Sequence, residues 1–137
     1  MTSDAIIRFS ISLPQELLGS LDEKIAEHGY ASRSEYVRDL IRGQIVEDLW
    51  SIPTEKVIGV LTLIYDHHQR ELLQKIMDIQ HNADAEILCS THVHINHHNC
   101  IETVIIKGTP EQIENIANKI GGLKGINFSK LTKTATF

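Results

Sequence analysis

Seven of the eight histidines in this 137-residue chain lie between positions 67 and 98, beside one of its two cysteines. His92 and His94 are two residues apart in an apolar, β-branched segment, and Cys100 follows six residues later. If this segment is a strand, both imidazoles point to one face and Val93 faces the packed side. A tight turn then brings Cys100 to the same corner. Two imidazoles and one thiolate are donors that suit a late divalent metal ion.

A fourth ligand would close such a site, and five further histidines are available for it. They are His81, at the end of an expected helix, and His67, His68, His97 and His98. Residue spacing alone does not rank them. Glu102, two residues past Cys100, shares its strand face and could orient a metal-bound imidazole. Cys89 falls on the opposite face from the His92 and His94 pair, which indicates a packing role.

Composition narrows the class of protein. The chain is 42% hydrophobic and 23% charged with a formal net charge of -5, which argues against wholesale disorder and against a polybasic nucleic-acid binder. Aromatic residues at 5% argue against a base-stacking platform. The sequence has neither a membrane-span candidate nor a signal peptide, so we expect a cytoplasmic protein without membrane contact. Two cysteines make a disulfide framework implausible.

Residues 1–50 show the pattern of one strand and two helices. Apolar and polar residues alternate over 7–13, which predicts a half-buried strand that ends at Pro14. A helical pattern runs from Pro14 to Gly29, and the capping-box sequence at 32–35 starts a second helix near Arg33. One strand has no partner within this segment and the segment is too small for its own core. We therefore expect two copies to pair their strands in an antiparallel ribbon.

The remainder predicts a second unit after a short hinge at 51–56, where Pro53 interrupts the periodicity. Residues 57–137 read as strand, helix, strand, strand, helix and strand. The expected segments are 57–65, 67–80, 86–95, 100–107, 110–120 and 125–131. This βαββαβ order is that of a ferredoxin-like sheet with two helices on one face, which leaves the other face free to pair with another subunit. The predicted fold class is α+β.

The order of strand, helix and helix in residues 1–50 resembles the ribbon-helix-helix family of DNA-binding proteins, whose ribbon enters the major groove. On the polar face of this ribbon, Arg8 can donate two hydrogen bonds to guanine, and Ser10 and Ser12 can contact base edges. These three residues match the base-reading positions of the family. Arg33 and Ser34 begin the second helix, where free backbone N–H groups can hold phosphates.

The metal-ligand pattern extends the resemblance to almost the whole chain, from Ile6 to about Leu131. The residues that carry it are Gln80-His81, His92-Val93-His94-Ile95-Asn96 and Cys100-Ile101-Glu102. Together with the N-terminal arm they resemble the nickel-responsive transcriptional regulators of the NikR family. The resemblance implies a ribbon-helix-helix dimer joined to an ACT-like tetramerisation domain. It also implies one Ni(II) per subunit, held by His92, His94 and Cys100 of one subunit and His81 of a neighbour.

Two further groups of residues are candidate cation positions, one by resemblance to this family and one by departure from it. Glu35 and Asp39, one helical turn apart, resemble a secondary cation site. The chain departs from the family at His97 and His98, where relatives often carry acidic residues. With His67 and His68, these histidines are candidate ligands of outer metal sites.

We therefore expect a homotetrameric, nickel-dependent regulator that binds double-stranded operator DNA and acts mainly as a repressor, for example of nickel uptake. An alternative is a ribbon-helix-helix regulator that responds to copper, zinc or cobalt. An antitoxin-type repressor would need a disordered tail, whereas residues 57–137 read as folded. A zinc hydrolase would need an open metal position, which four protein ligands do not leave, so we do not expect an enzyme.

Overall fold

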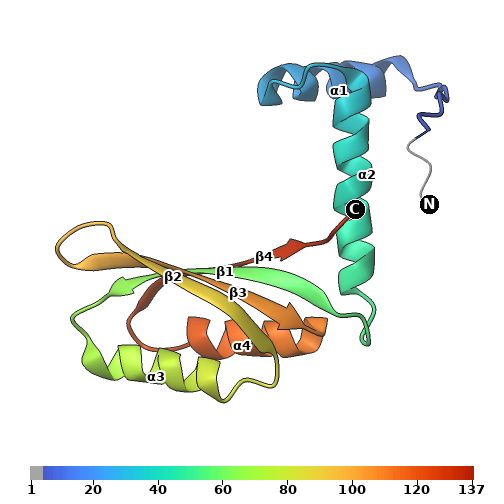
Figure 1. Cartoon of the computed structure of the whole chain (residues 1–137). Helices are drawn as coiled ribbons and strands as arrows, with labels where there is room; N and C mark the ends of the chain where they lie inside the picture. The colour runs from blue at the N-terminus through green and yellow to red at the C-terminus, as the bar shows by residue number, and fades with distance from the viewer. Residues whose placement is uncertain (1–4) are drawn as a thin grey trace. The chain divides into compact units, whose positions relative to one another are not determined.

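The computed structural model describes residues 5–137 and divides into two compact units, one up to Arg42 and one from Gly43 to Phe137. Its elements, labelled in Figure 1, are α1 (Gln15–His28), α2 (Arg33–Trp50), β1 (Val57–Asp66), α3 (Arg70–His81), β2 (Glu86–His94), β3 (Asn99–Gly108), α4 (Pro110–Gly121) and β4 (Ile126–Thr134). In the part of the chain described, every helix is too short or too polar to cross a membrane.

Local chemistry sets the ends of the two helices in the N-terminal unit. Helix α1 follows Pro14 and ends at Gly29, whose φ of 69° is a left-handed conformation that glycine adopts without steric strain. At the start of α2, the Ser32 hydroxyl accepts a hydrogen bond from the Glu35 N–H at 3.2 Å. This contact satisfies one of the free N–H groups of the first turn. Both predicted helices are thus confirmed.

Residues 5–14 form no strand in this single chain, although the sequence predicts one over 7–13. The alternating apolar residues of this segment are exposed, at 85% for Ile7 and 74% for Phe9. A strand takes its hydrogen bonds from a neighbouring strand, and the expected neighbour belongs to a second copy. The ribbon therefore stays a prediction about a pair of chains, and one chain shows the apolar face that pairing would bury.

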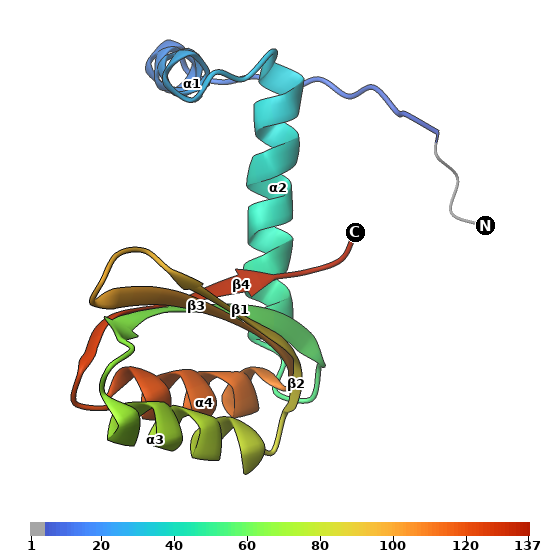
Figure 2. The same ribbon diagram turned by 60° about the vertical axis from the view of Figure 1, so that its left-hand side comes forward.

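The C-terminal unit is an antiparallel sheet in the order β2-β3-β1-β4, with α3 and α4 on one of its faces, as both views in Figures 1 and 2 show. The predicted βαββαβ order is confirmed. Leu61 and Leu63 of β1 and Ile113 of α4 are fully buried between the sheet and the helices. An added Cβ at Gly59 would lie 2.8 Å from the Ile113 side chain, so this strand position needs glycine.

The face of the sheet that the helices cover differs from the expectation. In the register of β2 and β3, His94 lies opposite Cys100 and His92 opposite Glu102, so all four share one face. Cys100 and Glu102 are buried, whereas Val93 is 53% exposed on the other face. The prediction that Val93 faces the packed side is therefore wrong, because alternation along a strand shows which side chains share a face but not which face the helices cover.

Two further expectations concern the edges of this unit. Cys89 does lie on the opposite face from the His92 and His94 pair, opposite Ile105, but it is exposed in the single chain and packs in no core there. Trp50, the last residue of α2, is buried and donates from Nε1 to the Thr134 carbonyl at 3.0 Å. The end of α2 is thus part of the C-terminal unit. The boundary between the two compact units falls within α2, at Gly43, whereas the sequence analysis places it after residue 50.

Candidate metal centre

The predicted metal ligands of one chain gather where β2 ends and β3 begins. His94 and Cys100 are directly opposite in the register, a position in which Cβ atoms lie about 4.5–5.5 Å apart. The rings of His92 and His94 are 5.2 Å apart between centroids, and the His67 ring stacks on that of His94 at 4.2 Å. Two exposed imidazoles beside one thiol are soft and intermediate donors, which fits a late divalent ion.

The thiol at this corner is enclosed by protein. Cys100 is fully buried, and its S–H donates to the Tyr65 backbone carbonyl at 3.4 Å. Burial raises the pKa of the Cys100 thiol, because a thiolate is poorly solvated there. A metal that takes this sulfur as ligand must therefore displace a proton.

Next to the thiol, the buried carboxylate of Glu102 accepts three hydrogen bonds. Oε2 accepts from the Tyr65 hydroxyl at 2.5 Å, and Oε1 accepts from the Ser90 hydroxyl at 2.7 Å and from the Gln80 amide at 3.2 Å. Burial, and then the hydrogen bond to Glu102, raise the pKa of Tyr65 well above its usual range. None of these three donors is the His92 imidazole, which lies opposite Glu102 in the register. Orientation of a metal-bound imidazole by Glu102 therefore stays a prediction.

His81 stands apart from the other predicted ligands. It is the last residue of α3 and is exposed. Among the ring contacts of residues 5–137, which connect six other histidines, none includes His81. The chain thus places His92, His94 and Cys100 on one face at one corner of the sheet, although their ligand atoms do not all lie within 4.8 Å of one another. The fourth predicted ligand, His81, lies outside this corner.

The outer histidines cluster beyond the same corner. The rings of His68, His97 and His98 lie within contact distance of one another, with centroids 5.0 to 5.9 Å apart. His67 is half-buried, with an Nδ1 that has no hydrogen-bond partner, and burial followed by the charge of His94 lowers its pKa. Residue Asp66, which the sequence analysis missed, contacts His68 Nδ1 at 3.0 Å. The sequence signal that could have identified Asp66 is its place directly before His67 and His68 at the end of a predicted strand.

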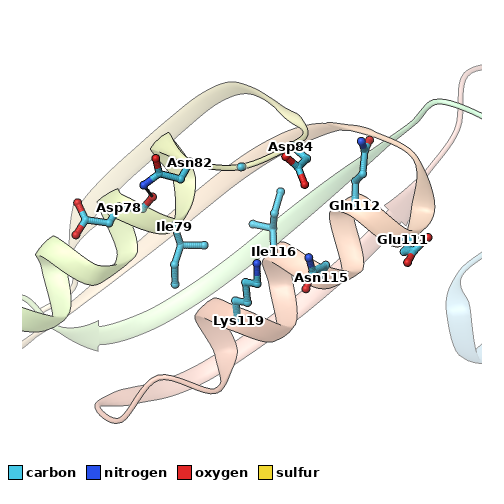
Figure 3. A pocket seen from close by; sticks show the side chains of 10 residues that line it. Asp78, Ile79, Asn82, Asp84, Glu111, Gln112, Asn115, Ile116 and Lys119 are labelled. Atoms are coloured by element: carbon cyan, nitrogen blue, oxygen red, sulfur yellow. Dashed lines mark hydrogen bonds between the residues drawn. The ribbon is translucent and has the colours of Figure 1, made fainter.

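A cleft between α3 and α4 is another feature that could hold a ligand (Figure 3). Its polar lining includes Asp78, Asp84, Glu111 and Lys119, and its apolar lining includes Ile79 and Ile116. No histidine or cysteine lines it. The cleft therefore lacks the nitrogen and sulfur donors found at the metal-ligand corner, by which we mean the sheet corner with the predicted ligands His92, His94 and Cys100.

The N-terminal unit places the predicted DNA-contacting residues on exposed backbone. Arg8, Ser10 and Ser12 are exposed in the segment before α1. The Arg33 guanidinium donates two hydrogen bonds to Asp22, both at 2.9 Å, so its side chain links α1 to α2. The groups left for the predicted phosphate contact are therefore the backbone N–H groups of Arg33 and Ser34.

At the predicted secondary cation pair, Asp39 already has partners. Its carboxylate accepts from the Tyr30 hydroxyl at 2.7 Å and from Arg42 at 3.1 Å, and these contacts lower the pKa of Asp39. Arg42 therefore offsets the repulsion expected between Asp39 and Glu35.

Known proteins share these features. The family model described as ribbon-helix-helix protein, copG family, matches residues 7–47, and the one described as NikR C terminal nickel binding domain matches residues 58–134. An ACT domain from a GTP pyrophosphokinase of Chlorobium tepidum superimposes with a TM-score of 0.50 at 8% identity, over 56% of this chain and 99% of that one. An uncharacterized Thermotoga maritima protein gives 0.52 at 19% identity, over 58% and 98%.

These findings define a class of protein, in which a ribbon-helix-helix unit precedes an ACT-like α+β unit. Two relatives named as nickel-responsive regulators are similar throughout. The one from Campylobacter concisus is 58% identical over 96% of both chains, and the one from Helicobacter hepaticus is 55% identical over 97% of both. The chain belongs to the NikR family of nickel-responsive regulators.

The three hydrogen bonds to Glu102 generate a first prediction. Glu102→Gln turns an acceptor into a mixed amide opposite three donors, and we expect it to reduce the free energy of unfolding by about 1–3 kcal/mol. Urea unfolding of metal-free protein at fixed concentration measures this loss. In a double-mutant cycle with Tyr65→Phe, the two losses should be less than additive because one bond is shared. Strict additivity would show that the Tyr65 contact contributes nothing.

Proposed function

We propose that this chain is a nickel-dependent transcriptional regulator, in which Ni(II) held by the C-terminal unit promotes binding of double-stranded operator DNA by the N-terminal ribbon. The observation that carries this proposal is the placement of exposed His92 and His94 beside the buried Cys100 thiol. Family membership supports nickel as the ion and DNA as the partner. Action mainly as a repressor in the cytoplasm, for example of nickel uptake, is part of the proposal.

The proposed site consists of His92, His94 and Cys100 of one subunit and His81 of a neighbour in a homotetramer, with one Ni(II) per subunit. Three imidazoles and one thiolate suit a planar four-coordinate d8 ion. With these four residues as ligands of one ion, two subunits would be held in one relative arrangement. The position of His81 outside the cluster of its own chain supports donation between chains. By linkage, operator DNA then tightens nickel binding by the factor by which nickel tightens DNA binding.

The two cysteines offer a matched test of the thiolate. We expect Cys100→Ser to lose tight nickel binding and the sulfur-to-nickel charge-transfer absorption, because a hydroxyl is a far poorer ligand for nickel. Cys89→Ser should keep both, because Cys89 lies on the opposite sheet face. Nickel titrations followed by absorption measure the difference. An unchanged spectrum in Cys100→Ser would exclude thiolate ligation.

Mixed tetramers test the donation of His81 between chains. His81→Ala subunits lack the donated ligand, and subunits with His92→Ala and His94→Ala lack the strand ligands, so neither parent should form a complete site. Mixed tetramers of verified composition should regain tightly bound nickel, because His81 of the second kind meets His92 and His94 of the first. Nickel is counted per tetramer after gel filtration. If mixing restores none, the ligands do not come from two chains.

The ribbon is tested through Arg8. Arg8→Ala should lose about 1–3 kcal/mol of specific binding per base contact, with nickel affinity and oligomeric state unchanged, because Arg8 is on the polar side of the alternating segment. Lys24→Ala, which removes one positive charge from α1, is the matched control and should alter only salt-dependent affinity. Footprints in the presence of nickel measure both variants. A wild-type footprint for Arg8→Ala would contradict the base-reading role.

A further inference from the structure

The N-terminal unit pairs most of its positive charges with its own acids. Residues 5–42 contain five lysine and arginine side chains, and three of them form ion pairs. Two of these pairs join residues three positions apart in one helix. The third joins two helices, because Arg33 is the first residue of α2 and its partner Asp22 belongs to α1. A unit that is expected to bind a polyanion thus holds part of its positive charge in contacts with itself.

The pair between Arg33 and Asp22 has the geometry of a phosphate contact. Arg33 Nε and Nη2 donate to the two carboxylate oxygens of Asp22, both at 2.9 Å. Arginine presents the same planar fork of donors to phosphate oxygens. These hydrogen bonds lower the pKa of Asp22, so its carboxylate is ionised at neutral pH. Asp22 therefore occupies the donors with which Arg33 would otherwise bind a phosphate.

The position of Arg33 in the chain makes this competition relevant to DNA. The first N–H groups of a helix have no acceptor inside the helix and can hold a phosphate. In α2 the Glu35 N–H donates to the Ser32 hydroxyl at 3.2 Å, which leaves the N–H groups of Arg33 and Ser34 for that contact. A phosphate at these groups would lie next to the residue whose guanidinium Asp22 holds. Backbone and side chain of Arg33 are thus available to DNA to different extents.

We propose that Asp22 is a positioning residue for DNA recognition, which withholds the Arg33 guanidinium from phosphates and so weakens binding to DNA that lacks the operator sequence. This inference rests on the proposed function, in which the ribbon reads an operator. At the operator, base contacts fix one position of the ribbon, whereas on other DNA the protein takes the position with the most phosphate contacts. A free guanidinium therefore gains more on other DNA than at the operator.

The size of the effect follows from the exposure of the pair. The side chains are 60% exposed for Arg33 and 47% for Asp22. Exposed ion pairs change an equilibrium by a factor of about 1.5 to 5, which is about 2- to 25-fold for the two copies in a dimer. Each phosphate contact that is gained steepens the fall of log affinity with log salt by about 0.9. Loss of Asp22 should therefore tighten binding to non-operator DNA and make it more sensitive to salt.

The test compares Asp22→Asn with Glu23→Gln, which removes the same charge from the next residue of α1, whereas the Arg33 donors contact Asp22. The nickel-loaded full chain is titrated at several salt concentrations with a duplex of mixed sequence and with a duplex that the wild type selects from a random pool. At about 0.1 M salt, Asp22→Asn should bind the mixed-sequence duplex about 2- to 25-fold more tightly. Its salt slope should be steeper by about two per dimer, and its affinity for the selected duplex should rise less. Glu23→Gln should keep the wild-type slope.

Variants of Arg33 separate this role from a general effect of charge or stability. In an Arg33→Gln background, Asp22→Asn should gain no more than Glu23→Gln, because no guanidinium is left to release. Asp22→Glu restores a carboxylate and should restore the wild-type slope. Arg33→Gln alone should keep the wild-type slope on the mixed-sequence duplex, a result that does not depend on whether Asp22→Asn folds.

Equal gains for Asp22→Asn and Glu23→Gln, a gain that persists without Arg33, or equal gains on the two duplexes would overturn the inference. A lower salt slope for Arg33→Gln alone would also overturn it, because the guanidinium would then already contact phosphate. Failure of the nickel-loaded wild type to prefer any selected duplex would instead contradict the proposed function. The inference is read separately, from the salt slopes on the mixed-sequence duplex.

Discussion

The metal-ligand corner depends on one buried charge, the carboxylate of Glu102. An unpaired ion at such a position costs several kcal/mol, so the carboxylate is tolerated because hydrogen-bond donors surround it. Its donors Tyr65, Ser90 and Gln80 come from β1, β2 and α3, while Glu102 itself belongs to β3. Satisfying one carboxylate therefore positions four elements relative to one another. Two of these elements also carry predicted ligands: His81 follows the donor Gln80 in α3, and His92 lies two residues after the donor Ser90 in β2.

The helices and strands were predictable because their signals are local. Proline before α1, glycine after it and the continuous apolar, β-branched run of β1 act within a few residues, and the boundaries of the elements that form agree within about three residues. The covered face was not predictable, because strand alternation is symmetric about the plane of the sheet. Only the packing of α3 and α4 makes Cys100 buried and Val93 exposed.

Contacts between residues that strand pairing or helix packing brings together could not be predicted from the sequence either. Asp66 and His98 are 32 positions apart in the sequence, and the register of β1 with β3 alone brings them together. Two donors of Glu102, Tyr65 and Ser90, come from paired strands, and the third, Gln80, comes from the packing of α3 on the sheet. The sequence therefore predicted an acid on the ligand face but not its partners. The N-terminal strand shows the opposite case. Its apolar side chains are exposed in the single chain and α1 has no buried residue, so pairing with a second chain stays a prediction.

The bond from Gln80 to Glu102 also bears on which chain the predicted ligand His81 would serve. It holds the end of α3 with the Gln80 side chain directed toward the sheet. Successive residues of an α-helix are turned by about 100°, so the next side chain, His81, is directed away from that contact. It is accordingly exposed, while His92 and His94 lie on β2. Turning His81 toward His92 and His94 of its own chain would rotate Gln80 away from the carboxylate that it contacts. Donation of His81 to another chain leaves that contact intact, which favours a site shared between subunits.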